Sequence, residues 1–255
     1  TLSDCMQDVF EDGPKRDRRL WLGDLRLQAL ADYASFDNTA LVKRCLYLFA
    51  GMATKEGKIS ANVFVSPKNI PDDTFLFEYS LFFISVLYDL HQAHPDTALV
   101  KELYPTAKRQ MDLSLQMFNE EGGLIPAEDY PVFVDWSNEF NKDTAGQAEM
   151  IYVLKQFISL SEIAGDSDTE FYRRKLALIS GYAKEKLYHQ ERKLFVTGND
   201  EYNIASQVWM VLAGVMSPEE NKEIMQTVVR EMFPVKGIAT PEGVKISVSM
   251  GKNLL

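Results

Sequence analysis

Cysteine and histidine are scarce in this sequence of 255 residues. The two cysteines, Cys5 and Cys45, are too few for a disulfide framework, and the three histidines form no Cys/His cluster with zinc-ligand spacing. We therefore expect neither a metal nor an organic cofactor.

Basic residues are in the minority, since 27 Lys and Arg face 37 Asp and Glu and leave a net charge of −10. A nucleic-acid backbone would be repelled by most of such a surface, so nucleic acid is not an expected partner.

Long apolar runs are also lacking. The longest, near Leu81 to Tyr88, is far shorter than the roughly 20 residues that cross a bilayer. A membrane-spanning protein is not expected.

The first residues carry no basic and apolar leader. Either the protein is intracellular, or a leader and upstream domains have been removed. The compartment therefore stays unknown, with the periplasm or secretion slightly favoured.

Helical periodicity is the strongest pattern in the sequence. Leu22, Leu25, Ala29 and Tyr33 follow the three-and-four spacing that places apolar side chains on one helix face. Similar spacing predicts about nine helices: Leu2–Phe10, Leu22–Phe36, Thr39–Met52, Phe75–His91, Thr97–Phe118, Thr144–Ala164, Thr169–Tyr188, Ile204–Val215 and Pro218–Phe233. Their boundaries carry the usual signals, such as a serine cap before proline at Ser217-Pro218.

β-branched runs are few, chiefly Ile59–Ser66 and Val244–Ser249, so a parallel sheet is not expected. Consecutive helical hairpins form either a solenoid or a closed α/α toroid, and the sequence lacks the repeats of a solenoid. We therefore predict an all-α toroid in a single domain over residues 1–255. Two long connections, Thr54–Thr74 and Asn119–Asp143, are long enough to suggest functional loops.

The densest group of chemically active side chains lies between residues 11 and 24. Gly13-Pro14 prevents a helix, so Asp12, Asp17 and Asp24 are carried by a rigid turn and the start of the next helix, where they converge. Arginines between them would keep some of these acids ionised, while an acid against Trp21 could keep its proton to higher pH. The alternative is a salt-bridged surface turn in which Asp24 only provides charge at a helix N-terminus.

A second group, residues 130–140, combines aromatic rings with acids. Asp135, Trp136 and Glu139 suit a carbohydrate site, because an aromatic face stacks on a sugar while carboxylates bind its hydroxyls. The alternative is a loop whose aromatics only cover the core. A third, weaker candidate is Glu78-Tyr79, at the start of a very apolar helix, where a helix-start charge at Glu78 is the simpler interpretation.

The stretch Asp12–Asp24, with the sequence DGPKRDRRLWLGD, resembles the signature of the α-L-rhamnosidase catalytic domain. Val134-Asp135-Trp136, followed by the helix from Thr144, resembles the later Asp-Trp loop of that family. The resemblance runs from about Cys5 to Thr240. It implies a six-hairpin glycosidase with an (α/α)6 toroid that binds sugar at one mouth, preceded in the full-length protein by β-rich domains.

By position, the resemblance implies that Asp12 and Asp24 bind rhamnose hydroxyls, that Asp17 is the general acid, and that Asp135 and Trp136 line the pocket. Position 17 is commonly Glu in the family, and Asp is one methylene shorter. Arg16, Trp21, Glu78 and Glu139 complete the set of candidate substrate-binding residues. The implied substrate is a rhamnose-containing glycan or glycoside, from which terminal rhamnose is removed with inversion.

The general base implied by the resemblance is a Glu from a hairpin near the C-terminal end of the toroid. The sequence predicts about nine helices, which is fewer than six helical hairpins contain. Glu242–Leu255 also does not resemble the expected helix. We therefore expect a toroid that is incomplete at its C-terminus, with the base outside this chain and Glu139 as the only substitute.

Two alternatives remain open. An unsaturated uronyl hydrolase on a similar toroid would need a basic group such as Arg16 for the substrate carboxylate. A catalytically inactive carbohydrate-binding toroid would explain the departure at Asp17 and the missing hairpins.

Overall fold

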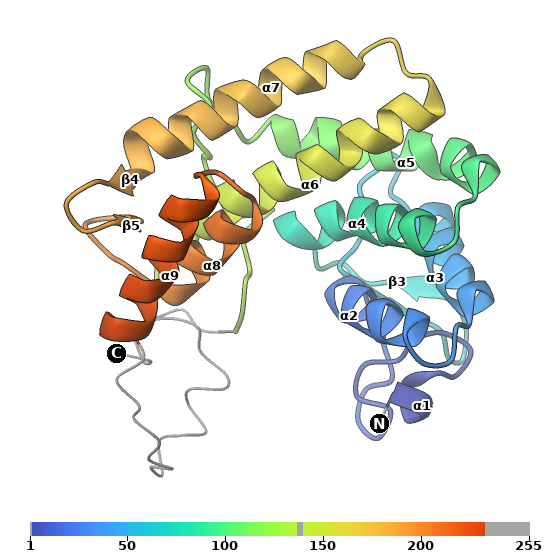
Figure 1. The fold of residues 1–255 in the computed structure, drawn as a ribbon. Helices are drawn as coiled ribbons and strands as arrows, with labels where there is room; N and C mark the ends of the chain where they lie inside the picture. The colour runs from blue at the N-terminus through green and yellow to red at the C-terminus, as the bar shows by residue number, and fades with distance from the viewer. Residues whose placement is uncertain (1, 137–139, 233–255) are drawn as a thin grey trace. The chain divides into compact units, whose positions relative to one another are not determined.

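The computed structural model describes residues 2–136 and 140–232, which are mainly helical (Figure 1). The α-helices are α1 (Leu2–Cys5), α2 (Leu22–Tyr33), α3 (Thr39–Gly51), α4 (Phe77–Ala93), α5 (Thr97–Leu115), α6 (Asp143–Ala164), α7 (Thr169–Tyr182), α8 (Ile204–Leu212) and α9 (Pro218–Glu231). A π-helical turn, Ala183–Leu187, extends α7. The predicted helices are thus confirmed in position, although several of them end two or three residues earlier or later than predicted, and the first ends at Cys5 rather than Phe10. The predicted end of the last helix, Phe233, lies outside the described residues.

The strands are short: β1 (Leu20–Trp21), β2 (Asn62–Phe64), β3 (Ile70–Pro71), β4 (Tyr188–His189) and β5 (Leu194–Phe195). All pairs among these five strands are antiparallel, in agreement with the expectation that a parallel sheet is absent. The β-branched run at Ile59–Ser66 contains β2. The other run, Val244–Ser249, lies outside the described residues.

The chain divides into two compact units. Unit 1 comprises Thr1–Gln116, Asp129–Pro131 and Val153–Tyr172, and unit 2 comprises Met117–Glu128, Val132–Tyr152 and Arg173–Leu255. The expectation of a single catalytic domain over residues 1–255 stays a prediction.

Helix α4 forms the centre of unit 1. It packs against α2, α3 and α5, and side chains on nearly every side of it are buried, including Phe77, Leu81, Phe83 and Leu87. A helix that is apolar all round is stable only inside a core, because each buried side chain of this size contributes about 1.5–3 kcal/mol. The core of unit 1 therefore surrounds α4.

A three-stranded ribbon in the order β1-β2-β3 adjoins these helices. Leu20 pairs with Val63, which in turn pairs with Pro71. Leu20 and Val63 are both fully buried and form the core side of the ribbon. Because side chains alternate between the faces of a strand, Asn62 and Phe64 lie on the opposite face.

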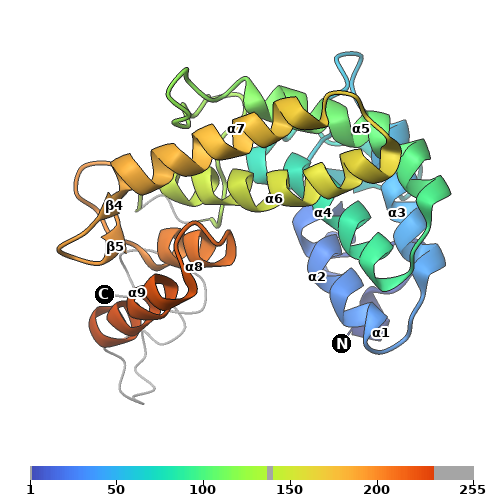
Figure 2. The ribbon, with the colours of Figure 1, turned by 45° about the horizontal axis from the view of Figure 1, so that its top comes forward.

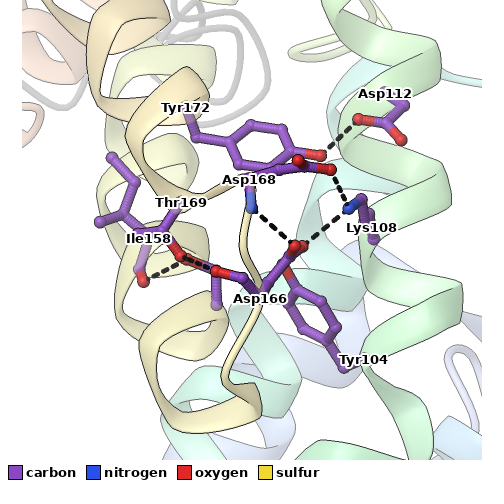
Figure 3. Close-up of polar contacts among 9 residues, drawn as sticks. Tyr104, Lys108, Asp112, Ile158, Asp166, Asp168, Thr169 and Tyr172 are labelled. Carbon is purple, nitrogen blue, oxygen red and sulfur yellow. Dashed lines mark hydrogen bonds and ion pairs between the residues drawn. The ribbon is translucent and has the colours of Figure 1, made fainter.

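A polar cluster joins α5 to the turn after α6 within unit 1 (Figure 3). Oδ2 of Asp166 accepts hydrogen bonds from the hydroxyl of Tyr104 at 2.6 Å and from Nζ of Lys108 at 2.8 Å. Nζ of Lys108 also donates to Asp168 at 2.7 Å. Burial alone would raise the pKa of Asp166, but these hydrogen bonds outweigh it and hold the pKa below its usual value.

In unit 2, α8 packs against both α9 and β5 (Figure 2). The side chain of Asn203 caps α8 by accepting from the N–H of Ser206 at 2.9 Å. The cap predicted at Ser217-Pro218 is confirmed, and Glu220 completes a capping box there. Within residues 2–136 and 140–232, the helices are too short or too polar to span a bilayer.

Candidate active site

Residues 12–19 form a tight loop closed by backbone pairing. Asp12 and Arg19 make an antiparallel bridge in which the N–H of Asp12 donates to the carbonyl of Arg19 at 2.8 Å. Inside the loop, the N–H groups of Arg16 and Arg18 donate to the carbonyl of Gly13 at 2.7 and 3.3 Å. The rigid turn predicted at Gly13-Pro14 is confirmed.

Gly13 gives this loop its shape for two reasons. Its φ of +57° lies in the left-handed region, which glycine adopts without steric cost. A Cβ at this position would lie 2.6 Å from Oδ1 of Asp17, closer than real Cβ atoms come. The absence of a side chain at Gly13 therefore makes room for the carboxylate of Asp17.

The structure brings together the three aspartates that the sequence singled out. Strand β1 follows the loop and α2 begins directly after Trp21, which places Asp24 in the first turn of α2. The charges of Asp12 and Asp17 both act on the carboxyl of Asp24. Three carboxylates from the loop and the helix start thus form one cluster.

Two arginines compensate part of this negative charge. Nη2 of Arg16 lies 3.1 Å from Oδ2 of Asp12, and Nε of Arg16 lies 3.5 Å from Oδ1 of Asp17. Nε of Arg19 lies 3.9 Å from Oδ2 of Asp17. The Arg16 side chain is 73% exposed, so its ion pairs contribute at most about 1 kcal/mol each. The Arg16 pairs therefore orient the carboxylates more than they stabilise the fold.

Asp24 is the carboxyl in this cluster whose pKa is raised, to about 6. Burial is the largest cause, and the negative charge of Asp12 adds to it, while the backbone N–H of Asp24 and the cation of Arg16 oppose the shift. A carboxyl with this pKa is partly protonated near pH 6. It can therefore both donate to and accept from a neighbouring hydroxyl.

Two polar atoms of the cluster are buried without a hydrogen-bond partner in the described chain. They are Oδ1 of Asp17 and Nε of Arg19. Both atoms take part in the ion pairs described above, but a buried polar atom that lacks a hydrogen bond still costs about 1–3 kcal/mol. A bound polar ligand that completes these hydrogen bonds would remove that cost.

An aromatic pair lies beside the cluster. The rings of Trp21 and Tyr79 meet edge to face, with 6.1 Å between their centroids. A Cβ on Gly23 would lie 2.7 Å from the Tyr79 ring, so the glycine allows this close approach. The predicted candidate Trp21 is therefore joined by Tyr79, which follows the weaker candidate Glu78 in the sequence.

Glu78, the weaker sequence candidate, lies in the first turn of α4 and is almost fully buried. Its charge acts on the phenol of Tyr130, whose pKa rises to about 12, mainly because of burial. Its role in sugar binding stays a prediction.

Asp135 and Trp136 belong to unit 2. Trp136 is 75% exposed and meets the ring of Phe133 edge to face at 5.0 Å. Nζ of Lys142 donates to the carbonyl of Asp135 at 2.6 Å, and the N–H of Trp136 donates to Oδ1 of Asp135 at 2.7 Å. A tryptophan this exposed does little to cover a core, which favours the carbohydrate-site hypothesis. Glu139 lies outside the described residues.

Sequence reasoning missed Asp72, which contacts Arg19 at 3.7 Å. One indication of Asp72 was present in the sequence: this residue lies in the long connection Thr54–Thr74, which was expected to be a functional loop. In the part of the chain that the structure describes, groups of His, Cys, Asp and Glu suited to a metal ion are absent.

The sequence model of the bacterial alpha-L-rhamnosidase six-hairpin glycosidase domain matches residues 1–236. The chain belongs to this family. No curated protein matches the sequence significantly. The family match confirms the resemblance drawn from Asp12–Asp24.

Solved structures agree with this rhamnosidase family assignment. A rhamnosidase from Klebsiella oxytoca with rhamnose bound is 46% identical, with a TM-score of 0.87 over 90% of this chain and 45% of its own. A GH78 rhamnosidase from Bacillus sp. GL1 is 20% identical, with a TM-score of 0.78 over 90% of this chain and 25% of its own.

A GH63 mannosylglycerate hydrolase from Thermus thermophilus shares the fold at 12% identity, with a TM-score of 0.65 over 91% of this chain and 75% of its own. The predicted all-α class, built from the helical hairpins of the (α/α)6 glycosidases, is confirmed. The rhamnosidase-family chain spans less than half the length of the two rhamnosidases compared above.

Proposed function

We propose that this chain forms part of a glycoside hydrolase that removes terminal α-L-rhamnose from glycans or glycosides with inversion. The observation that carries the proposal is the cluster of Asp12, Asp17 and Asp24 beside two arginines. Membership of the rhamnosidase family and the 46% identity to a rhamnose-bound rhamnosidase support the choice of sugar.

In this proposal Asp17 is the general acid. Its protonated carboxyl gives a proton to the glycosidic oxygen, and the bond from that oxygen to the anomeric carbon breaks with its electron pair moving to the oxygen. Water attacks the anomeric carbon from the opposite face, and a second carboxylate takes the proton of that water. Inverting enzymes keep roughly 6.5–9.5 Å between the two carboxyl groups to leave room for the water.

The second carboxylate remains a prediction. The family resemblance implies a Glu from a hairpin near the C-terminal end of the toroid, and Glu139 is the only substitute that we consider within this sequence. Asp12 and Asp24 bind the ring hydroxyls in this proposal, and the partly protonated Asp24 is suited to a hydroxyl that both donates and accepts. Sugar contacts by Trp21, Glu78, Asp135 and Trp136 are proposed on the same basis.

The contacts of Arg16 argue against the uronyl hydrolase alternative. That reaction needs a cation that is available for a substrate carboxylate. Arg16 already lies between the carboxylates of Asp12 and Asp17, at 3.1 and 3.5 Å. A substrate carboxylate there would compete with Asp12 and Asp17 for the same guanidinium, so a neutral deoxy sugar suits the cluster better.

An inactive carbohydrate-binding toroid is the second candidate, favoured by Asp at position 17. Release of the aryl group from an aryl α-L-rhamnoside by the whole protein separates the two. We expect hydrolysis that Asp17→Asn reduces by at least about a hundredfold and that Asp8→Asn, at an exposed aspartate, leaves unchanged.

Calorimetric titration with rhamnose completes the comparison. Binding without hydrolysis by the unmodified protein would support the inactive toroid, and hydrolysis unaffected by Asp17→Asn would refute Asp17 as the acid. Glu139→Gln tests the substitute base: if the base lies outside this chain, this variant keeps its activity.

A further inference from the structure

The side chain of Arg19 is held on three sides in unit 1. Nε lies 3.9 Å from Oδ2 of Asp17, and Nη1 lies 3.7 Å from Oδ2 of Asp72. The guanidinium also lies over the ring of Phe64, 4.3 Å from its centroid. Arg19 thus connects the proposed acid to a second carboxylate that the rhamnosidase signature does not contain.

The register of the β1-β2-β3 ribbon explains this arrangement. Leu20 pairs with Val63, so the preceding residue, Arg19, comes opposite Phe64. Val63 pairs with Pro71, so Asp72 comes opposite Asn62. Asn62 and Phe64 are two residues apart and share a face of β2. Arg19 and Asp72 therefore meet diagonally across that face.

Asp72 is fixed by neighbours other than Arg19. Oδ2 accepts from Nδ2 of Asn62 at 2.7 Å and from the hydroxyl of Thr74 at 3.0 Å, and Oδ1 accepts from the N–H of Asp73 at 3.0 Å. Burial alone would raise the pKa of Asp72, but these hydrogen bonds and the charge of Arg19 lower it. Asp72 is therefore a rigid, ionised partner for Arg19.

The charges around Asp17 in the described chain come from the loop, from α2 and from the ribbon. They are Arg16, Arg19, Asp12, Asp24 and, through Arg19, Asp72. A general acid next to an unshared arginine would lose its proton too readily, because a cation within about 4–6 Å favours the carboxylate. The second partner of Arg19 limits this effect.

We propose that Asp72 is a positioning residue, which holds Arg19 on the β ribbon and so sets how strongly the guanidinium of Arg19 acts on Asp17. This rests on the proposed function, in which Asp17 is the general acid. Asp72 itself does not touch the sugar in this proposal. Its carboxylate acts by sharing the positive charge of Arg19 and by fixing the distance between Arg19 and Asp17.

The first test is the pH profile of kcat/KM for an aryl α-L-rhamnoside. Asp72→Asn removes a negative charge and frees Arg19 to approach Asp17, and both effects favour the carboxylate of Asp17. We expect the basic limb of the profile to move about one pH unit lower, which makes hydrolysis about tenfold slower above the limb and nearly unchanged below it. A uniform loss at every pH would show a merely structural role and overturn the proposal.

Further variants keep the test decisive if Asp72→Asn folds poorly. Arg19→Met removes the cation next to Asp17 and should move the basic limb to higher pH. In that background, Asp72→Asn should shift the limb much less than it does alone. Asp72→Glu keeps the negative charge at position 72, so its basic limb should lie close to that of the unmodified protein. The matched control is Asp73→Asn, which makes the same charge change at the next, exposed position and should not move the limb.

A measurement without hydrolysis separates this proposal from the proposed function. The carboxyl carbon of Asp17 can be titrated by NMR in protein labelled with 13C-aspartate, with Asp17→Asn to assign the signal. A lower Asp17 pKa in Asp72→Asn supports the positioning role even if the enzyme cleaves no rhamnoside. An unchanged Asp17 pKa overturns the positioning role even if rhamnoside hydrolysis is confirmed.

Discussion

Replacing Asp24 with Asn should stabilise the protein at neutral pH while reducing sugar hydrolysis. The pKa of Asp24 is about 6 in the fold against a usual 3.8, because the carboxyl is largely buried and lies near Asp12 and Asp17. The folded protein therefore binds more protons than the unfolded chain between these two pH values. By linkage, stability falls as the pH rises from about 4 to about 6 and is then constant.

The size of this effect follows from the shift. A difference of about two pH units corresponds to about 3 kcal/mol at pH 7, since each unit is worth about 1.4 kcal/mol. Solvent near the partly exposed carboxyl screens some of this, so about 2 kcal/mol is the expected gain for the neutral, isosteric Asn. A gain of that size raises the unfolding midpoint of a domain this large by roughly 4–8 °C.

Thermal unfolding of the protein and of the Asp24→Asn variant at pH 4 and pH 7 provides the assay. The variant should be more stable at pH 7, and the difference should nearly vanish at pH 4, where Asp24 itself is mostly protonated. Asp8→Asn, at an exposed aspartate in the N-terminal segment, is the matched control and should change little at either pH. A variant that is less stable at pH 7, or equally stabilised at both, would refute this account of Asp24.

Three further predictions concern other parts of the two units. Gly13→Ala should cost at least about 1 kcal/mol and lower activity, because φ is +57° there and the new Cβ would press on Asp17; equal stability in urea unfolding would contradict this. Asp166→Asn should cost about 2 kcal/mol at pH 7, because it weakens the hydrogen bond from Lys108. This loss should shrink as the pH falls below about 4, because the unfolded chain takes up its proton at the usual pKa while the folded carboxylate, whose pKa is lowered, takes it up only at lower pH. Chemical unfolding of the protein and of Asp166→Asn at pH 3 and at pH 7 measures the loss of stability at each pH. Trp136→Ala should change stability by less than about 0.5 kcal/mol, because the side chain is 75% exposed, but should raise KM for an aryl rhamnoside if its ring stacks on the sugar; an unchanged KM removes Trp136 from the proposed site.

Helix positions were readable from the sequence because apolar side chains must repeat every three or four residues to face one core. Helix α4 shows this at its strongest, since its apolar residues occupy nearly the whole circumference and the helix is buried on nearly every side. The Ser217-Pro218 cap was readable because it depends only on neighbouring residues. The first helix was predicted too long because the N–H of Glu11 turns back to the carbonyl of Cys5 at 2.8 Å, a pairing that periodicity does not reveal.

The candidate site was only partly readable. Asp12, Asp17 and Asp24 are close in sequence, and Gly13-Pro14 limits how far apart they can lie. Asp72 was not identified, because its contact with Arg19 depends on how β3 pairs with β2 and β2 with β1. Pairing between strands distant in sequence depends on tertiary packing and not on the local residue pattern.

The amino-acid sequence by itself determined which segments become helices, which loop carries the acids and which family the chain resembles, since periodicity, turn chemistry and a compact motif are all local. Only the tertiary structure decided which acid has a raised pKa and which acid shares Arg19. Those properties depend on burial and on charges brought close by folding.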